Sequence, residues 1–254
     1  MLATILVLPV AALVLRVPPA RLAARLAEPE ILDALRLSLV TSVSAAALAV
    51  VLGLPVAYLL ATRSFPGKRL VEAAIDLPMV LPPTVAGLAL LLAFGRTGLA
   101  GRALEGLGIT LPFTTVAVVL AQVFMAAPFF IGAARAGFAA VDRRLLDAAA
   151  TLRASEIRIF FHVMLPLARP ALLAGLAMAL ARALGEFGAT ITFAGNLPGV
   201  TQTMPLAVYL ALQTDLEAAV TLAVLLLVIS FGLLLTLRAA PAGRLRTRDA
   251  DAPR

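Results

Sequence analysis

Five stretches of this chain are long enough and apolar enough to cross a lipid bilayer as helices, and this feature limits the fold more than any other. A membrane-spanning helix needs about 20 mostly apolar residues. The stretches are Leu35–Leu60, Leu77–Phe94, Phe113–Gly132, Pro170–Phe193 and Ala218–Leu237. Over the whole chain 62% of residues are hydrophobic and only 14% are charged, whereas soluble domains have roughly 45–50% apolar and about 25% charged residues. The sequence therefore predicts an all-α, polytopic membrane helix bundle.

The N-terminal segment Met1–Leu15 is also apolar, but it is short and contains Pro9. A signal peptide would carry a basic residue before its apolar part and a small-residue cleavage site after it. In this chain nothing basic precedes the apolar part, and Arg16 follows it. We therefore interpret the segment as a first transmembrane helix, which gives about six spans in a single domain covering residues 1–254.

The basic residues predict the orientation of these spans. With six spans and a cytoplasmic N-terminus, fourteen of the 21 Lys and Arg residues fall on one side, in the second loop, the fourth loop and the C-terminal tail. Six fall on the other side, and Arg182 lies within a span. Since cytoplasmic loops collect Lys and Arg, both termini are expected in the cytoplasm and residues 196–203 outside. The net charge of +7 has the same origin, so no nucleic-acid partner is expected, because such proteins gather basic residues on one face.

The supply of reactive side chains is small. The chain has no Cys and a single His, His162, which excludes thiolate and multi-histidine metal sites. A membrane enzyme would need a cluster of titratable residues that this sequence lacks. Neither catalytic nor metal-ligating residues are therefore predicted.

A polar segment, Asp142–Pro166, separates two of the spans and reads DRRLLDAAATLRASEIRIFFHVMLP. Its apolar residues recur at helical spacing, and Ser155 can cap a second short helix with Glu156 in the favourable first turn. We expect two short helices joined by a turn near Arg153–Ala154 and ending at Pro166. Such a structure either lies on the membrane surface or offers its apolar stripe to a partner protein.

The spacing of this segment resembles the EAA loop of ABC importer permeases. That loop has Glu-Ala-Ala, a Gly four positions after the second Ala, and Ile-x-Leu-Pro at a fixed distance. The matching positions here hold Asp147-Ala148-Ala149, Arg153 and Val163-Met164-Leu165-Pro166. Asp147 keeps the charge of the family's Glu. Arg153 replaces the Gly, which costs roughly 1 kcal/mol if that turn requires a left-handed backbone.

The resemblance implies the type I ABC importer permease fold, with a core over about 35–237 and a coupling loop at 142–166. In the family, this loop sits in a groove of a separate ATPase subunit. The implied ATPase-coupling residues are Asp147, Ala148, Ala149, Leu152, Arg153, Val163, Leu165 and Pro166. The phosphate-loop pattern G-x-x-x-x-G-K-[ST] is missing from this chain, so ATP and magnesium are expected on the partner ATPase. One chain supplies one loop while the family's transporters use two, which implies a homodimer.

The last third of the chain resembles the oxyanion branch of these permeases. Arg182–Ala189 reads RALGEFGA, which is shared in kind by sulfate and molybdate permeases. Phe193–Thr203 reads FAGNLPGVTQT and is closest to molybdate permeases. The resemblance implies import of molybdate delivered by an extracytoplasmic oxyanion-binding protein, with sulfate or tungstate as the alternative substrates. A secondary transporter is a more distant alternative, since the sequence has no obvious inverted repeat.

Two charges, Arg182 and Glu186, fall inside a predicted span, four residues apart on one helix face. Charges within a span usually face the bundle interior or water. They are interpreted either as part of the translocation path or its gate, or as a mutually satisfied pair that sets helix packing.

Three threonines, Thr84, Thr190 and Thr192, are candidate weak donors along the path. Their hydroxyls could equally bond back to their own helices. Gly188 would permit close approach of helices. Asn196–Gly199 has the composition of a turn, and it is either a docking point for the binding protein or a plain surface turn.

Overall fold

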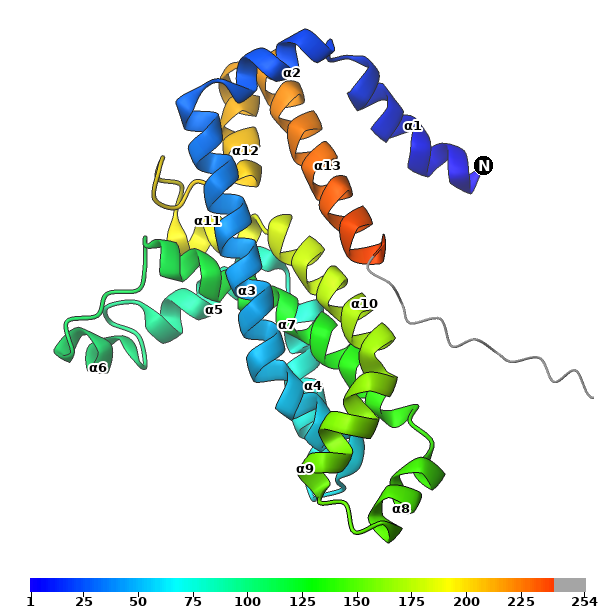
Figure 1. Ribbon diagram of the computed structural model, residues 1–254. Coiled ribbons are helices and arrows are strands. Elements are labelled where there is room, and N and C mark those ends of the chain that lie inside the picture. Colours follow the sequence, from blue (N-terminus) through cyan, green and yellow to red (C-terminus); the bar gives the residue numbers. More distant parts are fainter. Residues whose placement is uncertain (240–254) are drawn as a thin grey trace, which may run out of the picture.

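The computed structural model describes residues 1–239, and the regular elements within that range are all helical (Figure 1). They are α1 Leu2–Leu15, α2 Pro19–Leu26, α3 Pro29–Thr62, α4 Lys68–Val80, α5 Pro83–Phe94, α6 Gly101–Gly106, α7 Thr115–Ala139, α8 Arg143–Thr151, α9 Glu156–Ile159, the π-helical turn η1 Phe160–Met164, α10 Leu165–Leu184, α11 Gly188–Ala194, α12 Met204–Thr214 and α13 Leu216–Ala239. The predicted all-α fold is confirmed. The tail residues Arg244, Arg246, Arg248 and Arg254, which contribute to the predicted orientation, lie outside the described residues.

Four helices in the described range are long and apolar enough to cross a membrane, and a bent pair makes a fifth crossing if its two halves count as one. The four are Pro29–Thr62, Thr115–Ala139, Glu156–Leu184 and Leu216–Thr236. The N-terminal helix α1 is apolar but shorter, and it stands apart from the bundle with α13 as its neighbour (Figure 1). Six spans is therefore an approximate description of this chain.

The predicted span Leu77–Phe94 is interrupted between Val80 and Pro83. The chain bends by 118° between helices α4 and α5. Leu81 is extended, with φ −67° and ψ 135°, because the α region is disfavoured for a residue that precedes proline. The second helix begins at Pro83, since proline is tolerated in the first turn.

The boundaries expected for the span Pro170–Phe193 are wrong at both ends. A single helical run of 29 residues extends from Glu156 to Leu184, through Pro166, where the polar loop was expected to end. The π-helical turn η1 makes this possible, because the Leu165 N–H bonds to Phe160 O just before a proline that has no N–H to donate. At the other end the helix stops at Leu184, and α11 follows as a separate helix after a three-residue break.

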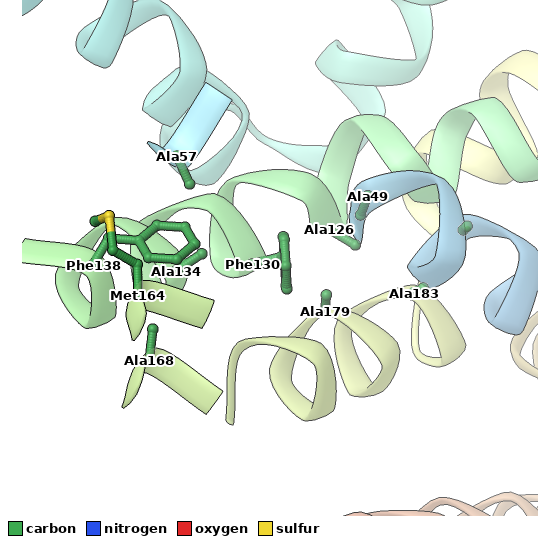
Figure 2. Close-up of a cluster of buried hydrophobic side chains, with 11 residues drawn as sticks. Ala49, Ala57, Ala126, Phe130, Ala134, Phe138, Met164, Ala168, Ala179 and Ala183 are labelled. Carbon is green, nitrogen blue, oxygen red and sulfur yellow. The ribbon is translucent and has the colours of Figure 1, made fainter. Parts of the chain in front are cut away.

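Small residues hold the centre of the bundle together. Helices α3, α7 and α10 meet in a buried cluster that consists mainly of alanine (Figure 2). Its buried members are Ala45, Ala49, Ala57, Ala126, Phe130, Ala134, Phe138, Met164, Ala168, Ala179 and Ala183. A Cβ atom on Gly175 would lie 2.8 Å from Ala133 Cβ, so the backbones are already in close contact. This is the packing that drives helix association in lipid, where burial of apolar surface contributes little.

Candidate functional site

The polar loop folds into two short helices, as predicted. Asp142 caps α8, with Oδ1 accepting from Arg144 N at 2.9 Å. Ser155 caps α9, with Oγ accepting from Arg158 N at 3.3 Å. Short polar side chains at these positions bind the free N–H groups of the first turn, and this local chemistry sets where each helix starts.

The turn between the two helices has a left-handed residue, Arg153, with φ 58°. Its N–H bonds to Ala150 O at 2.9 Å, and the Ala154 N–H bonds to Ala149 O at 3.2 Å. These bonds satisfy carbonyls at the end of α8, as left-handed residues commonly do at helix ends. The position therefore needs the conformation that glycine adopts most easily, and Arg153 occupies it at a cost of roughly 1 kcal/mol.

The loop exposes large apolar side chains that nothing in the described chain covers. Leu152 is 84% exposed and Ile157 is 72% exposed. Asp147 and Ala148 are exposed beside them, and Ala149 is partly buried. These residues form a small-residue and apolar surface at the free end of the molecule (Figure 1).

The second half of the matched motif, Val163–Pro166, lies in the helical run Glu156–Leu184 and not in the loop. Val163 and Leu165 are partly buried in the long helical run, and Pro166 is exposed on it. The structure therefore divides the eight predicted coupling residues into a loop group and a helix group. The turn at 152–155 separates α8 from the helical run that carries the helix group.

Two ion pairs that sequence reasoning missed join the segments next to this loop to the rest of the bundle. Arg135, near the end of α7, has Nη1 2.9 Å from Glu72 Oε1 on α4. Arg63, which follows α3, pairs with Glu156 at the start of α9. The partners are far apart in sequence, so no local pattern could have identified them.

The predicted pair Arg182 and Glu186 does form, but not on one continuous helix. Arg182 lies in the last turn of α10, and Glu186 lies in the break that follows. Arg182 Nη1 is 2.5 Å from Glu186 Oε2. The other carboxylate oxygen, Oε1, accepts from Ala189 N at 2.7 Å. Glu186 is only 1% exposed, so a buried carboxylate ties the end of α10 to the start of α11.

The three candidate threonines differ in burial and in the hydrogen bonds of their hydroxyls. Thr192 Oγ1 donates to Gly188 O at 2.9 Å, within its own helix. Thr190 is fully buried, and its hydroxyl has no hydrogen-bond partner among the described residues. Thr84 is exposed in the first turn of α5.

Helix α5 lies directly against α11, as expected from Gly188. A Cβ on Gly188 would lie 2.7 Å from Pro83 Cβ and 3.2 Å from Thr84 N. A Cβ on Gly87 would lie 2.7 Å from Ala189 O. Thr84 is therefore brought to the same end of α11 as Glu186, whereas the other glycine of the break, Gly185, makes no such close contact.

The segment after α11 is a turn, as its composition predicts. Leu197 O accepts from the N–H groups of Val200, Thr201 and Gln202. Gly199 has φ 73°, a conformation that suits glycine. Residues 197–200 are exposed, so the tip of this turn is accessible.

The arrangement of helices matches that of solved ABC transporters. A bacterial ABC transporter that imports the acidic polysaccharide alginate matches with a TM-score of 0.70 at 14% identity, over 87% of this chain and 82% of that chain. The MetNI methionine ABC transporter in an inward-facing conformation matches with a TM-score of 0.61 at 19% identity, over 82% of this chain and 91% of that chain. This chain therefore has the fold of the type I ABC importer permeases.

Curated relatives make the assignment more specific. The chain is 45% identical over 227 residues to the molybdenum transport system permease protein of Mycobacterium bovis, covering 88% of this chain and 84% of the relative. It is 44% identical over 190 residues to the protein of that description from Escherichia coli K12, covering 74% and 82%. A probable sulfate transport system permease protein of Chlorokybus atmophyticus is 36% identical over 209 residues, covering 82% and 73%.

Residues 49–240 match the family described as the binding-protein-dependent transport system inner membrane component, and the chain belongs to this family. It is therefore a multi-pass membrane protein that serves as the permease component of a transport system.

Proposed function

We propose that this chain is the transmembrane permease subunit of an ATP-driven importer that moves molybdate into the cytoplasm. The observation that carries the proposal is the 45% identity to a molybdenum permease over 88% of the chain. The sulfate permease named above is less similar, at 36%. Sulfate or tungstate is the alternative cargo.

The proposed route of coupling begins at the loop. A separate ATPase subunit, which holds ATP and magnesium, contacts Asp147, Ala148, Ala149, Leu152 and Arg153. Since Val163, Leu165 and Pro166 lie in the helical run from Glu156 to Leu184, a displacement of the loop reaches the interior of the bundle through one rigid element. Closure of the ATPase would then shift the α10–α11 break.

In this proposal the polar break contributes to the translocation path or its gate. Arg182 is 24% exposed, so part of its guanidinium is available to an anion. The adjacent Glu186 carboxylate offsets much of the positive charge, which suits a contact that must release its ion quickly. Thr84, Thr190 and Thr192 would add weak hydroxyl contacts.

The complete transporter would contain two copies of this chain, two ATPase subunits and an extracytoplasmic oxyanion-binding protein. The binding protein would dock on the side where the turn at 196–203 lies. The charge bias of the sequence supports this side as external and both termini as cytoplasmic.

The coupling role is tested by changing the loop surface alone. Ala149→Arg places a bulky charge where a partner would approach closely, and Leu152→Glu removes an apolar side chain that is 84% exposed. Both variants should insert normally, lose the co-purifying ATPase or its stimulated hydrolysis, and fail to import. Leu99→Glu is the matched control, since Leu99 is 96% exposed in a different loop. If both loop variants keep parental ATPase binding and hydrolysis, the loop does not couple.

The cargo is tested in liposomes that contain the whole transporter and its binding protein. Import of labelled molybdate should require ATP, and unlabelled molybdate should compete better than sulfate or tungstate. Better competition by sulfate or tungstate would reassign the cargo. Import that needs an ion gradient and no ATP would favour a secondary transporter.

A further inference from the structure

Three buried residues, one each on α7, in the α10–α11 break and on α11, have polar side-chain atoms without a hydrogen-bond partner in the described part of the chain. The atoms are Gln122 Nε2, Gln122 Oε1, Glu186 Oε2 and Thr190 Oγ1. Gln122 and Thr190 are completely buried, and Glu186 is 1% exposed. Glu186 Oε2 has a charge partner in Arg182, but no donor reaches it with hydrogen-bond geometry. Unpaired polar groups are costly away from water, so three such residues together require an explanation.

The packing of α7 against α10 places Gln122 at the level of Glu186. The two helices run antiparallel, and a Cβ on Gly137 would lie 2.6 Å from Ala171 Cβ, which sets the register. Extended past Leu184, where α10 ends, this register brings Gln122 to the level of the break that holds Glu186. One turn before this level, Ala126 of α7 and Ala183 of α10 belong to the same buried cluster (Figure 2).

Contacts on the other side of Gln122 lead to the same place. Met125 of α7 packs in one buried cluster with Ala189 and Phe193 of α11. Ala189 is the residue whose N–H bonds to Glu186 Oε1. Gln122 therefore lies between two packed surfaces, one formed with α10 and one formed with α11.

The unpaired atoms are chemically complementary. A glutamine amide offers donors on Nε2 and an acceptor on Oε1, a carboxylate accepts, and a hydroxyl donates. We propose that Gln122 is a positioning residue of the α10–α11 break. Its Nε2 donates to Glu186 Oε2 and its Oε1 accepts from the Thr190 hydroxyl, each through an ordered water, because no direct hydrogen bond joins these atoms.

The bridge gives the break a defined mechanical role, and this role rests on the proposed coupling function. A three-residue break at 185–187 could absorb a shift of the long helix. With Gln122 holding the segments on both sides of the break against α7, the shift is passed on to α11 and to α5, which lies against it. Gln122 thus acts on transport through Glu186 and Thr190.

The test uses the complete transporter with Gln122→Met, which keeps the volume and removes the hydrogen bonds, with Thr190→Val, and with both. Each single change should lower the Tm and reduce oxyanion import per ATP hydrolysed by about threefold or more, the average effect of losing one interhelical hydrogen bond in a membrane. The double variant should be no worse than Gln122→Met alone, because Gln122→Met already removes the link to Thr190. Met125→Leu, a volume-conserving change one turn away, should leave both quantities unchanged.

Several results would overturn the bridge. Gln122→Met would raise the Tm if the amide is simply unpaired, and the two losses would add if the residues act independently. A lower Tm with unchanged import per ATP would remove the positioning role. If Gln122→Met does not assemble, Gln122→Asn, which keeps the amide, should restore assembly, and failure of both variants would refute the bridge. A parental transporter that imports no oxyanion would refute the proposed function. The Tm values of the two single variants and the double variant would still show whether Gln122 and Thr190 are linked.

Discussion

Arg63, the residue that follows α3, binds both carboxylate oxygens of Glu156 at the start of α9, with Nη2 3.1 Å from Oε1 and 2.9 Å from Oε2. The residues are 93 positions apart. The contact therefore joins the connection between α3 and α4 to the start of the helical run that leads through the bundle. The side chains are 57% and 75% exposed, so water screens their attraction.

We expect Arg63→Gln to change the free energy of unfolding by less than about 1 kcal/mol, because exposed ion pairs contribute little. Its effect on substrate-stimulated ATP hydrolysis should be larger than its effect on stability, since the pair helps to orient α9. The charge-reversed double variant Arg63→Glu with Glu156→Arg should recover hydrolysis. A double variant as impaired as the sum of the two single ones would contradict a direct pairing.

Arg153→Gly should stabilise the loop by up to about 1 kcal/mol, because glycine adopts the φ of 58° without steric cost. Coupling to the ATPase should be preserved. The matched change Ala150→Gly, inside α8, should instead destabilise by about 1 kcal/mol. Thermal unfolding and ATPase stimulation of the two variants check this, and equal effects at both positions would exclude the backbone explanation.

Neutralising Arg182 should be more damaging than neutralising Glu186. Arg182→Gln leaves a carboxylate that is 1% exposed without its charge partner, which costs about 3–5 kcal/mol. Glu186→Gln leaves a guanidinium that is partly exposed, and it keeps an acceptor for the Ala189 N–H. The double variant should recover part of the loss. Thermal unfolding measures the cycle, and normal stability with lost import would favour a direct role in the translocation path.

Gly87→Ala should destabilise the bundle by about 1–3 kcal/mol, because the new Cβ would lie 2.7 Å from Ala189 O, a backbone atom that cannot move aside easily. Gly132→Ala is the control, since nothing lies within 4 Å of a Cβ there. That change should be neutral or slightly stabilising in a helix. Thermal unfolding of the two variants distinguishes close packing from a general intolerance of alanine.

The predicted topology is open to a direct test because the chain has no cysteine. An impermeant thiol reagent should label Val200→Cys in intact cells, and it should label Leu152→Cys only after lysis. Both positions are exposed, at 43% and 84%, so accessibility within the protein does not limit the reaction. The reverse labelling pattern would invert the orientation.

The local features of this protein follow from its sequence. Helices of about 20 apolar residues, the caps at Asp142 and Ser155, and the turn at Arg153 depend on neighbouring residues, so periodicity and composition were sufficient to predict them. The resemblance in the loop and in the last third led to the permease family, which the match over residues 49–240 confirms.

Only the tertiary structure decided where the spans break and which polar groups meet. The run Pro170–Phe193 is uncharged throughout except at Arg182 and Glu186 and has no proline after its first residue, so nothing in its sequence forces an interruption after Leu184. There the Glu186 carboxylate binds a backbone N–H of the next helix, and Gly188 allows α5 to approach. The position of Gln122 relative to the α10–α11 break depends on the register of α7 against α10. These relationships form between segments far apart in the chain, and side-chain pairing and close packing across that distance determine them.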